Sequence, residues 1–469
     1  MLFSSPVFLL FFLLFFVTYT IAPLRYRLAV IIVGSTIFYG YWNVYLTLFP
    51  HALMLIAFFG TIWMARAEAK GQKARLFVVV AALLAPLVVV KYGAFLYNSV
   101  TYVLNSQAVL LRALPLPLGI SFVTFTLIAY VVDVYRGRYQ LERRVSMLAG
   151  LVLFFPHLIA GPILRPADLL PQIKRPRLPR RMFWPRMSFG IAIFTLGLVK
   201  KLVIADPLSG VVDTVFRGGN TFSAQEYWIA INAFAAQIYC DFSGYTDMAI
   251  ALAMMIGIRL PRNFNRPYMS RSLVEFWHRW HITLSTWLRD YLYIPLGGNR
   301  LGFPRQIGNL LITMALGGLW HGANWTFVIW GLMHGGGLAV THAFNHLKSP
   351  VDIVAARFPT FVKIAATYVF VLIGWVWFRA QDVESGARIL VGSVTAPWGD
   401  WSGILGQYGF ELVLLALFFA THRFDNHRIV RDAVRKVPAA IVIPTLVLMW
   451  VLAVAISQGN SAKFVYFDF

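Results

Sequence analysis

The chain has 469 residues, of which 59% are hydrophobic and 13% are charged. Ordinary soluble domains carry about 25% charged residues, so this composition excludes a soluble globular protein and predicts an all-α polytopic membrane protein. The formal net charge of +22 does not indicate a nucleic-acid partner, because the basic residues lie between hydrophobic runs, where the positive-inside rule places cytoplasmic loops.

Hydrophobic runs of about 20 residues, long enough to cross a bilayer, recur along the whole chain. The first run has no basic residues ahead of it and no small-residue cleavage motif after it, so we expect it to be retained rather than cleaved. The predicted spans are 3–22, 27–46, 48–65, 76–101, 117–135, 187–205, 226–257, 324–345, 359–378, 407–421 and 437–456.

Five basic clusters separate these runs, and anionic lipid headgroups would attract them. They are Arg66–Arg75, Arg136–Arg144, Arg165–Arg186, Arg259–Arg305 and Arg423–Lys436. No metal site is expected, because the chain has a single cysteine, Cys240, and no H-E-x-x-H arrangement. We expect Cys240 to be a small buried hydrophobic residue, with a covalent thiol role as the alternative.

Two apolar segments do not have the pattern of simple spans. Residues 145–164 contain Phe155–Pro162 and have basic clusters on both sides, and residues 307–321 are short and rich in glycine at their end. Broken or re-entrant backbone at membrane depth is tolerated only where protein or a water-filled cavity surrounds it. Both segments therefore predict an enclosed cavity. The absence of a repeat in the sequence counts against repeat arrays and inverted-repeat transporters.

His281 lies in a tryptophan-rich amphipathic segment. If residues 271–292 form one helix, His281 falls on an apolar stripe about 120° wide, while His278 lies at its margin and faces solvent or lipid phosphate. The alternative is an interfacial anchor helix in which His281 only hydrogen-bonds a carbonyl. The stripe consists of Trp277, Trp280, His281, Leu284, Trp287, Leu288 and Tyr291.

His321 is the stronger candidate for chemistry. It lies in a hydrophobic stretch next to Gly322, with Trp320 and Trp325 as flat apolar neighbours. A titratable group at membrane depth is costly and is functional by default, and an imidazole moves protons well at neutral pH. The alternative is a packing histidine bonded to Ser, Thr or Asn. On a continuous helix His334 would lie about 220° away from His321, on nearly the opposite side.

Two carboxylates, Asp241 and Asp247, enter a run that is otherwise apolar from Tyr227 to Ile258. Each costs at least about 2.5 kcal/mol at a helix centre, so a partner such as an arginine or a histidine is expected. These carboxylates could orient an imidazole, line a polar tunnel or hold helices together.

Together these motifs resemble the membrane-bound O-acyltransferase (MBOAT) family, in its bacterial alginate O-acetyltransferase branch. The resemblance covers the whole chain and implies one acyltransferase domain over 1–469, with a signature region at about 239–335 and a cytoplasmic amphipathic segment at about 259–306. It also implies a ring of about 11 transmembrane helices around re-entrant segments and a central tunnel. The matching strings are Asp241–Asp247, Phe276–Ser285, Asp290–Asn299, Leu319–Asn324, Gly119–Phe122, Phe155–Arg165 and Phe3–Pro6.

The resemblance implies that His321 is the catalytic histidine and His281 the second member of the signature pair. We expect His321 to act as general base on an acceptor hydroxyl, with Asp241 or a backbone carbonyl fixing its tautomer. His281, Trp320 or Asn324 would position the thioester or stabilise the oxyanion, and an acyl-histidine relay is the alternative to direct transfer. Tyr245 and Asp247 are further candidates for contact with the donor or the tunnel.

The expected donor is acetyl-CoA or another acyl thioester, which the basic residues of 259–306 would attract, and no bound cofactor is expected. The resemblance implies a bacterial inner-membrane location and an exported polysaccharide acceptor, with alginate first. It also implies a periplasmic esterase-like partner and export machinery. The alternatives are a transporter of an acyl carrier or lipid with His321 as a proton relay, and a non-catalytic scaffold of a polysaccharide export complex.

Overall fold

The structure, a computed structural model, describes residues 1–104, 110–112, 114–175, 183–218, 221–347, 358–457 and 464. Helices make up the ordered elements of these ranges, and no β-strand occurs in them. A helix satisfies its backbone hydrogen bonds within one segment, as the bilayer core demands. The predicted all-α class is therefore confirmed. Residues 176–182, part of the predicted Arg165–Arg186 cluster, lie outside the described ranges.

The chain divides into two compact units. The first combines Met1–Phe194 with Tyr245–Pro261, and the second combines Thr195–Gly244 with Arg262–Phe469. The long helix α12 (Ala224–Met255) belongs to both, with the division between Gly244 and Tyr245. The single domain over 1–469 stays a prediction.

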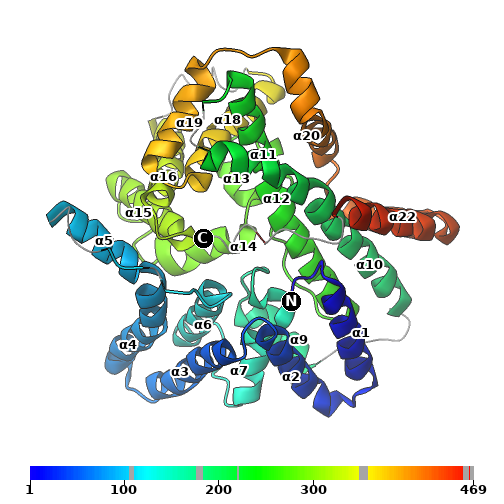
Figure 1. Cartoon of the computed structure of the whole chain (residues 1–469). Helices are drawn as coiled ribbons and strands as arrows, with labels where there is room; N and C mark the ends of the chain where they lie inside the picture. The colour runs from blue at the N-terminus through cyan, green and yellow to red at the C-terminus, as the bar shows by residue number, and fades with distance from the viewer. Residues whose placement is uncertain are drawn as a thin grey trace. The chain divides into compact units, whose positions relative to one another are not determined.

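In the first unit, α3 packs against α4 and α6, and α2 packs against α7 and α8 (Figure 1). A π-helical turn at Val88–Tyr92 joins α4 to α5 without a break. The helices are α1 (Pro6–Ile21), α2 (Arg27–Gly40), α3 (Leu48–Ala65), α4 (Ala69–Leu87), α5 (Gly93–Leu104), α6 (Ile120–Tyr135), α7 (Val145–Val152), α8 (Phe155–Leu158), α9 (Pro166–Lys174) and most of α10 (Phe183–Val199).

The segment 145–164 is broken, as predicted. With eight residues, α7 is about 12 Å long, far short of the roughly 30 Å of a hydrocarbon core. All residues from Met147 to Leu164 are buried. Two polar groups of the break have protein partners: the Phe155 N–H donates to Ser35 Oγ at 3.0 Å, and His157 Nε2 lies 2.7 Å from the Leu151 carbonyl oxygen.

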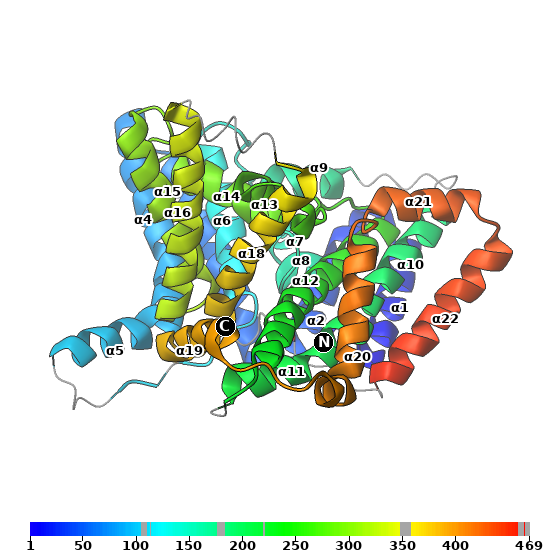
Figure 2. The ribbon, with the colours of Figure 1, turned by 90° about the horizontal axis from the view of Figure 1, so that it is seen from above.

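In the second unit, α15 and α16 lie side by side as an antiparallel pair, and α16 also packs against α13 and α18 (Figures 1 and 2). π-Helical segments precede α11 at Lys200–Ala205 and follow α14 at Arg289–Tyr293. The helices are α11 (Asp206–Arg217), α13 (Leu273–Arg279), α14 (Ile282–Leu288), α15 (Phe303–His321), α16 (Trp325–Leu347), α18 (Thr360–Arg379), α19 (Val383–Thr395), α20 (Trp401–His422), α21 (His427–Lys436) and α22 (Ala439–Ser457).

The prediction that 307–321 is a short broken segment is wrong, because these residues form most of the continuous 19-residue helix α15. Its glycines serve close packing instead. A Cβ on Gly318 would lie 2.1 Å from the Phe327 carbonyl oxygen, and one on Gly331 would lie 2.3 Å from the Met314 carbonyl oxygen. At each of these contacts a glycine of one helix meets the backbone of the other directly, which is how small residues bring membrane helices together.

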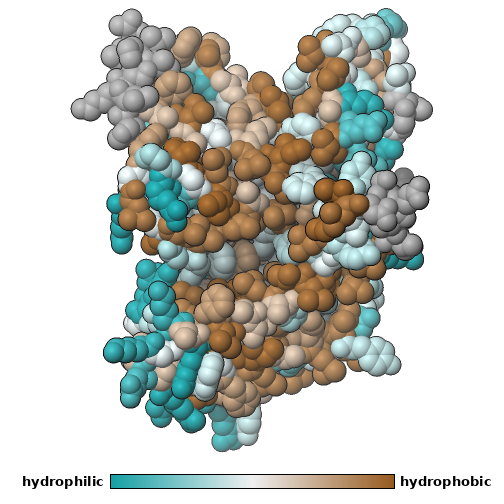
Figure 3. Space-filling view, turned by 90° about the vertical axis from the view of Figure 1, so that its left-hand side faces the viewer, coloured by the Kyte–Doolittle hydropathy of each residue, from teal (hydrophilic) through white to brown (hydrophobic). Residues whose placement is uncertain are grey.

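Within the described ranges, seven helices are long and apolar enough to cross a membrane. Each of the eleven predicted spans overlaps a helix, but a count of eleven transmembrane helices stays a prediction. Hydrophobic side chains cover much of the face in Figure 3, between polar patches. A surface this apolar suits lipid contact, and the protein is a multi-pass membrane protein. The seven helices are Tyr45–Ala65, Ala69–Leu104, Phe183–Arg217, Trp325–Phe344, Thr360–Arg379, Trp401–His422 and Ala439–Ser457.

The glycine contact between α15 and α16 predicts a position-specific cost. We expect Gly318→Ala to lower the unfolding free energy by about 1–3 kcal/mol, because the new methyl group meets a rigid carbonyl. Gly336→Ala on α16 is the matched control, since a Cβ there meets nothing within 4 Å. Thermal unfolding of the purified protein in detergent measures both, and equal midpoints for the two variants would contradict the packing argument.

Candidate active site

His321 is buried at the end of α15, where the chain turns. Its ring contacts those of Trp320, Trp330 and Phe378, with centroid distances of 4.8, 5.1 and 4.9 Å. A Cβ on Gly322 would lie 2.1 Å from the Phe327 ring, so the residue after the imidazole must be small. The structure thus holds a buried imidazole against aromatic walls from α15, α16 and α18.

His281 lies in a break between two short helices, so the prediction of one helix over 271–292 is wrong. Helix α13 ends at Arg279, α14 begins at Ile282, and His281 adopts a left-handed backbone with φ of 39°. This conformation costs about 1–2 kcal/mol for a residue other than glycine, so other contacts must hold it.

Asn263 holds the break, and nothing in the sequence pointed to it. Its Oδ1 accepts hydrogen bonds from the N–H and the hydroxyl of Thr283, at 3.2 and 2.9 Å, and lies 3.1 Å from His281 Nδ1. Because Oδ1 only accepts, the proton of a neutral His281 ring belongs on Nδ1. The Ile282 N–H also donates to the Asn263 carbonyl. Asn263 therefore positions the imidazole and sets its tautomer.

The predicted sorting of inward and outward residues is confirmed even though the single helix is not. Most of the predicted stripe is buried, Tyr291 is half-buried, and His278 is exposed. The same residues are buried as predicted because the break turns the chain without exchanging its buried and exposed faces. The buried members are Trp277, Trp280, His281, Leu284, Trp287 and Leu288.

Trp320 lies between the two predicted catalytic histidines. Its ring centroid is 5.9 Å from that of His281 and 4.8 Å from that of His321, and both contacts are edge-to-face. Trp320 is itself buried. The structure therefore brings His281, Trp320 and His321 together within the second unit.

His334 lies close to this group, and its predicted place on the opposite side is wrong. That prediction assumed a continuous helix, but the helix ends at His321 and α16 folds back along α15. Trp330 consequently contacts both His321 and His334, at 5.1 and 4.9 Å between ring centroids. His334 is fully buried, and neither ring nitrogen has a hydrogen-bond partner within the described residues.

Asp241 has the partner that its burial predicted, and this partner is a lysine rather than an arginine or a histidine. Lys201 Nζ lies 2.8 Å from Asp241 Oδ1 and 2.7 Å from Asp206 Oδ1, and all three side chains are largely buried. Lys201 lies on the π-helical segment before α11, so the ion pairs tie that segment to α12. The neighbouring Phe242 packs edge-to-face on His281 at 4.7 Å. This geometry favours the interpretation that Asp241 holds helices together.

Three further candidates have structural contacts of their own. Asn324 donates from Nδ2 to the Gln381 carbonyl at 2.6 Å and accepts from the Thr326 N–H at 3.1 Å, so it anchors the start of α16. Tyr245 and Asp247 are buried in the first unit, where Tyr245 stacks on Phe3 at 4.5 Å. Contact of any of the three with the donor or tunnel stays a prediction.

Cys240 is buried within the hydrophobic core of the second unit, as predicted. Among the described residues, no group of three histidine, cysteine, aspartate or glutamate side chains is arranged to hold a metal ion.

A buried imidazole behind aromatic walls suits transfer of an activated group. It can accept a proton from a hydroxyl or attack a carbonyl itself. The surrounding rings of Trp320, Trp330 and Phe378 exclude water from His321, and water would otherwise compete with the acceptor for a reactive ester.

Comparison with known proteins gives the same family as the sequence motifs. The profile of the MBOAT, membrane-bound O-acyltransferase family matches residues 35–381. The "Probable alginate O-acetylase AlgI" of Pseudomonas putida is 38% identical over 500 residues, covering 100% of both chains. The "Peptidoglycan O-acetyltransferase" of Helicobacter pylori is 35% identical, covering 84% of this chain and 80% of its own. The "Teichoic acid D-alanyltransferase" of Bacillus subtilis is 25% identical, covering 56% and 69%.

The buried charge cluster predicts an ordered set of stability effects. Lys201→Met should destabilise the protein by about 3–5 kcal/mol, because it leaves Asp206 and Asp241 without their shared cation. Asp241→Asn should cost less, since Lys201 keeps Asp206. Thermal unfolding in detergent tests the order. A Lys201→Met variant at least as stable as Asp241→Asn would show that the cluster does not hold the helices.

Proposed function

Because this chain belongs to the membrane-bound O-acyltransferase family, we propose that it passes an acetyl group from a cytoplasmic thioester to an exported polysaccharide, with alginate as the favoured acceptor. The observation that carries the proposal is the buried His321 at the end of α15, enclosed by Trp320, Trp330 and Phe378. The chain is an O-acyltransferase, and the names of its relatives support acetyl as the group and polysaccharide as the acceptor class.

In the proposed reaction, His321 acts as general base. Its imidazole takes the proton of the acceptor hydroxyl while the oxygen attacks the thioester carbonyl. When the carbon–sulfur bond breaks, the imidazolium returns the proton to the thiolate, so the imidazole is restored. In the alternative route the imidazole attacks the carbonyl first, the carbon–sulfur bond breaks, and the thiolate takes the proton that the acylated ring loses. The acceptor hydroxyl then attacks the acyl-histidine, and the departing imidazole takes the hydroxyl proton.

His281 acts in this proposal as a positioning residue on the donor side. With Nδ1 facing Asn263, its Nε2 is the nitrogen that carries the lone pair. Trp320 contacts both imidazoles, so a shift of either one changes the wall against which the thioester is placed. A displacement of about 1 Å in such a wall costs up to roughly 10²-fold in rate.

The proposed donor is acetyl-CoA or another acyl thioester, and the proposed location is the bacterial inner membrane. The basic residues of 259–306 support an anionic donor on the cytoplasmic side. Because the acceptor then lies across the membrane, a periplasmic esterase-like partner and polysaccharide export machinery are part of the proposal. The relatives' names include alginate, peptidoglycan and teichoic acid, and identity over the whole chain supports alginate.

Substitution of His321 tests the catalytic assignment. We expect His321→Ala to lower acetyl transfer from radiolabelled acetyl-CoA by at least ~10²-fold in purified protein, because the base is lost. The control is His342→Ala, which removes a half-buried histidine from the same helix pair. Equal acetyl transfer by His321→Ala and the parent protein would contradict the assignment of His321 as the catalytic base.

The same variant in cells separates enzyme from scaffold. A strain carrying His321→Ala should secrete the normal amount of polymer without acetyl groups, since only the transfer step is lost. A scaffold whose histidines are structural would instead lose polymer secretion together with acetylation.

Substitution of Asn263 tests whether this residue positions His281. We expect Asn263→Ala to lower kcat/KM for the donor by about 10–10²-fold, because His281 and the α13–α14 break lose their shared anchor. His281→Gln should give a similar loss, and the double variant should lose little more. Steady-state kinetics with acetyl-CoA measures all three, and fully additive losses would show that the two residues act independently.

A further inference from the structure

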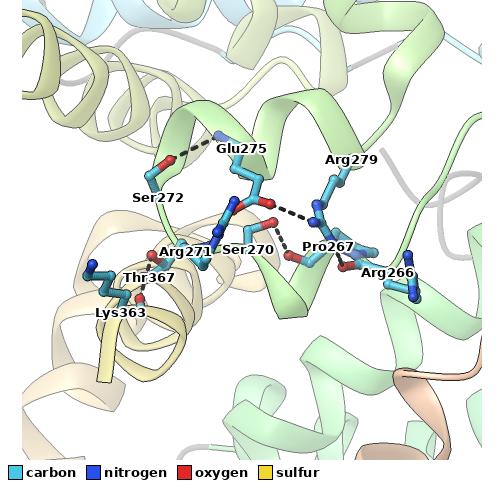
Figure 4. Close-up of polar contacts among 9 residues, drawn as sticks. All are labelled: Arg266, Pro267, Ser270, Arg271, Ser272, Glu275, Arg279, Lys363 and Thr367. Carbon is cyan, nitrogen blue, oxygen red and sulfur yellow. Dashed lines mark hydrogen bonds and ion pairs between the residues drawn. The ribbon is translucent and has the colours of Figure 1, made fainter. Parts of the chain in front are cut away.

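A second site lies on the outer side of α13, and its lining includes neither His281 nor His321. A pocket of about 440 Å³ opens between α13 and the start of α18. Figure 4 shows Lys363 on α18. It also shows Arg271 and Ser272, which directly precede α13, on the neighbouring segment. The pocket is lined by Arg271, Ser272, Val274, Glu275, His278 and Lys363, and none of these takes part in the proposed transfer.

The pocket is cationic in spite of its one carboxylate. Glu275 Oε2 accepts from the backbone N–H and Nε of Arg271, at 2.8 and 3.1 Å, and Oε1 accepts from Arg279 Nη2 at 2.5 Å. Burial alone would raise the pKa of the Glu275 carboxyl, but these contacts outweigh it and lower the pKa, so the group is ionised. Two arginines share its one charge, and Lys363 adds another positive charge.

The Glu275 carboxylate is engaged by Arg271 and Arg279, so donors remain to face the pocket. The contact with Glu275 fixes the Arg271 guanidinium at the rim, where it is 61% exposed. The Ser272 oxygen accepts the N–H of Glu275 at 3.2 Å, which leaves the hydroxyl proton directed elsewhere. A guanidinium, an ammonium and a hydroxyl around a small pocket suit the oxygens of a phosphate group.

The position of the pocket favours a lipid as the source of the phosphate. Lys363 lies in the first turn of α18, one of the helices long and apolar enough to span a membrane, so the pocket lies at the depth where a span begins. Phospholipid phosphates occupy this level. Phe358 and Phe361, close to Lys363 in the sequence, have large apolar side chains that are 51% and 71% exposed, as suits contact with acyl chains.

We propose that this pocket binds the phosphate of an anionic phospholipid headgroup. The site goes beyond acyl transfer and connects to it through α13. The opposite side of that helix presents Phe276 and Trp277, which pack on His334 at 6.0 and 5.3 Å, and Trp277 also contacts Trp330, the neighbour of His321. A lipid bound outside α13 would therefore support the aromatic wall inside it.

Native mass spectrometry of the purified full chain tests this site. The probes are phosphatidylglycerol and phosphatidylcholine, titrated separately into the detergent-solubilised protein. We expect the affinity for phosphatidylglycerol to fall about fivefold in Arg271→Gln and in Lys363→Gln, because each removes one positive charge. The double variant should lose more affinity than either single variant. Lys363→Arg should retain the affinity, and Arg388→Gln, at an exposed position on α19 outside the pocket and outside the five basic clusters, should leave it unchanged.

Two results would overturn the lipid assignment. One is equal affinity for phosphatidylglycerol in the double variant and the parent protein. The other is displacement of phosphatidylglycerol by coenzyme A, together with loss of coenzyme A binding in the double variant, which would assign the pocket to the donor. Because the readout is binding, failure of this proposal is separate from failure of the transfer reaction, which the His321 variant tests.

Discussion

The close approach of α15 and α16 is the contact on which the geometry of the candidate active site depends. Gly318 meets the Phe327 carbonyl and Gly331 meets the Met314 carbonyl, with no side chain between the backbones. Only at this separation does Trp330 on the returning helix reach His321 at the end of the first. The glycines that favoured a broken segment in the sequence therefore act by letting two unbroken helices touch, and the break follows at Gly322.

Buried polar contacts secure the remaining parts of the site. In an apolar environment an unpaired polar group is costly, so a buried polar contact stabilises one arrangement of its residues over others. Asn263 engages Thr283 and His281 together, which stabilises a backbone turn that His281 would not otherwise adopt. Lys201 ties Asp241 to Asp206, and the residue after Asp241 packs on the His281 ring. Helix packing and imidazole placement thus share the same few contacts.

The sequence predicted correctly the features that depend on residues close together in the chain. Hydropathy predicted helices over all eleven hydrophobic runs, since a run of apolar residues specifies its own environment. It could not place the break before His281, because Asn263, 18 residues earlier, determines it. The lysine partner of Asp241 lies 40 residues upstream in another helical segment. His334 was misplaced for the same reason: periodicity holds within one helix, and Gly322 ends the first helix before His334 is reached.

The short helix α13 shows how the surface and the candidate active site can be linked in such a fold. With seven residues it cannot be stable through its own backbone hydrogen bonds, since isolated helices shorter than about 12 residues are marginal. Its stability must come from both sides. On the inside Phe276 and Trp277 pack against His334, and on the outside Glu275 joins Arg271 and Arg279. An anion held by the outer charges would fix the helix from the side that its aromatic contacts leave open. The charged residues on the surface of α13 would then influence the position of the aromatic side chains around His321, although no group from the pocket reaches the imidazole.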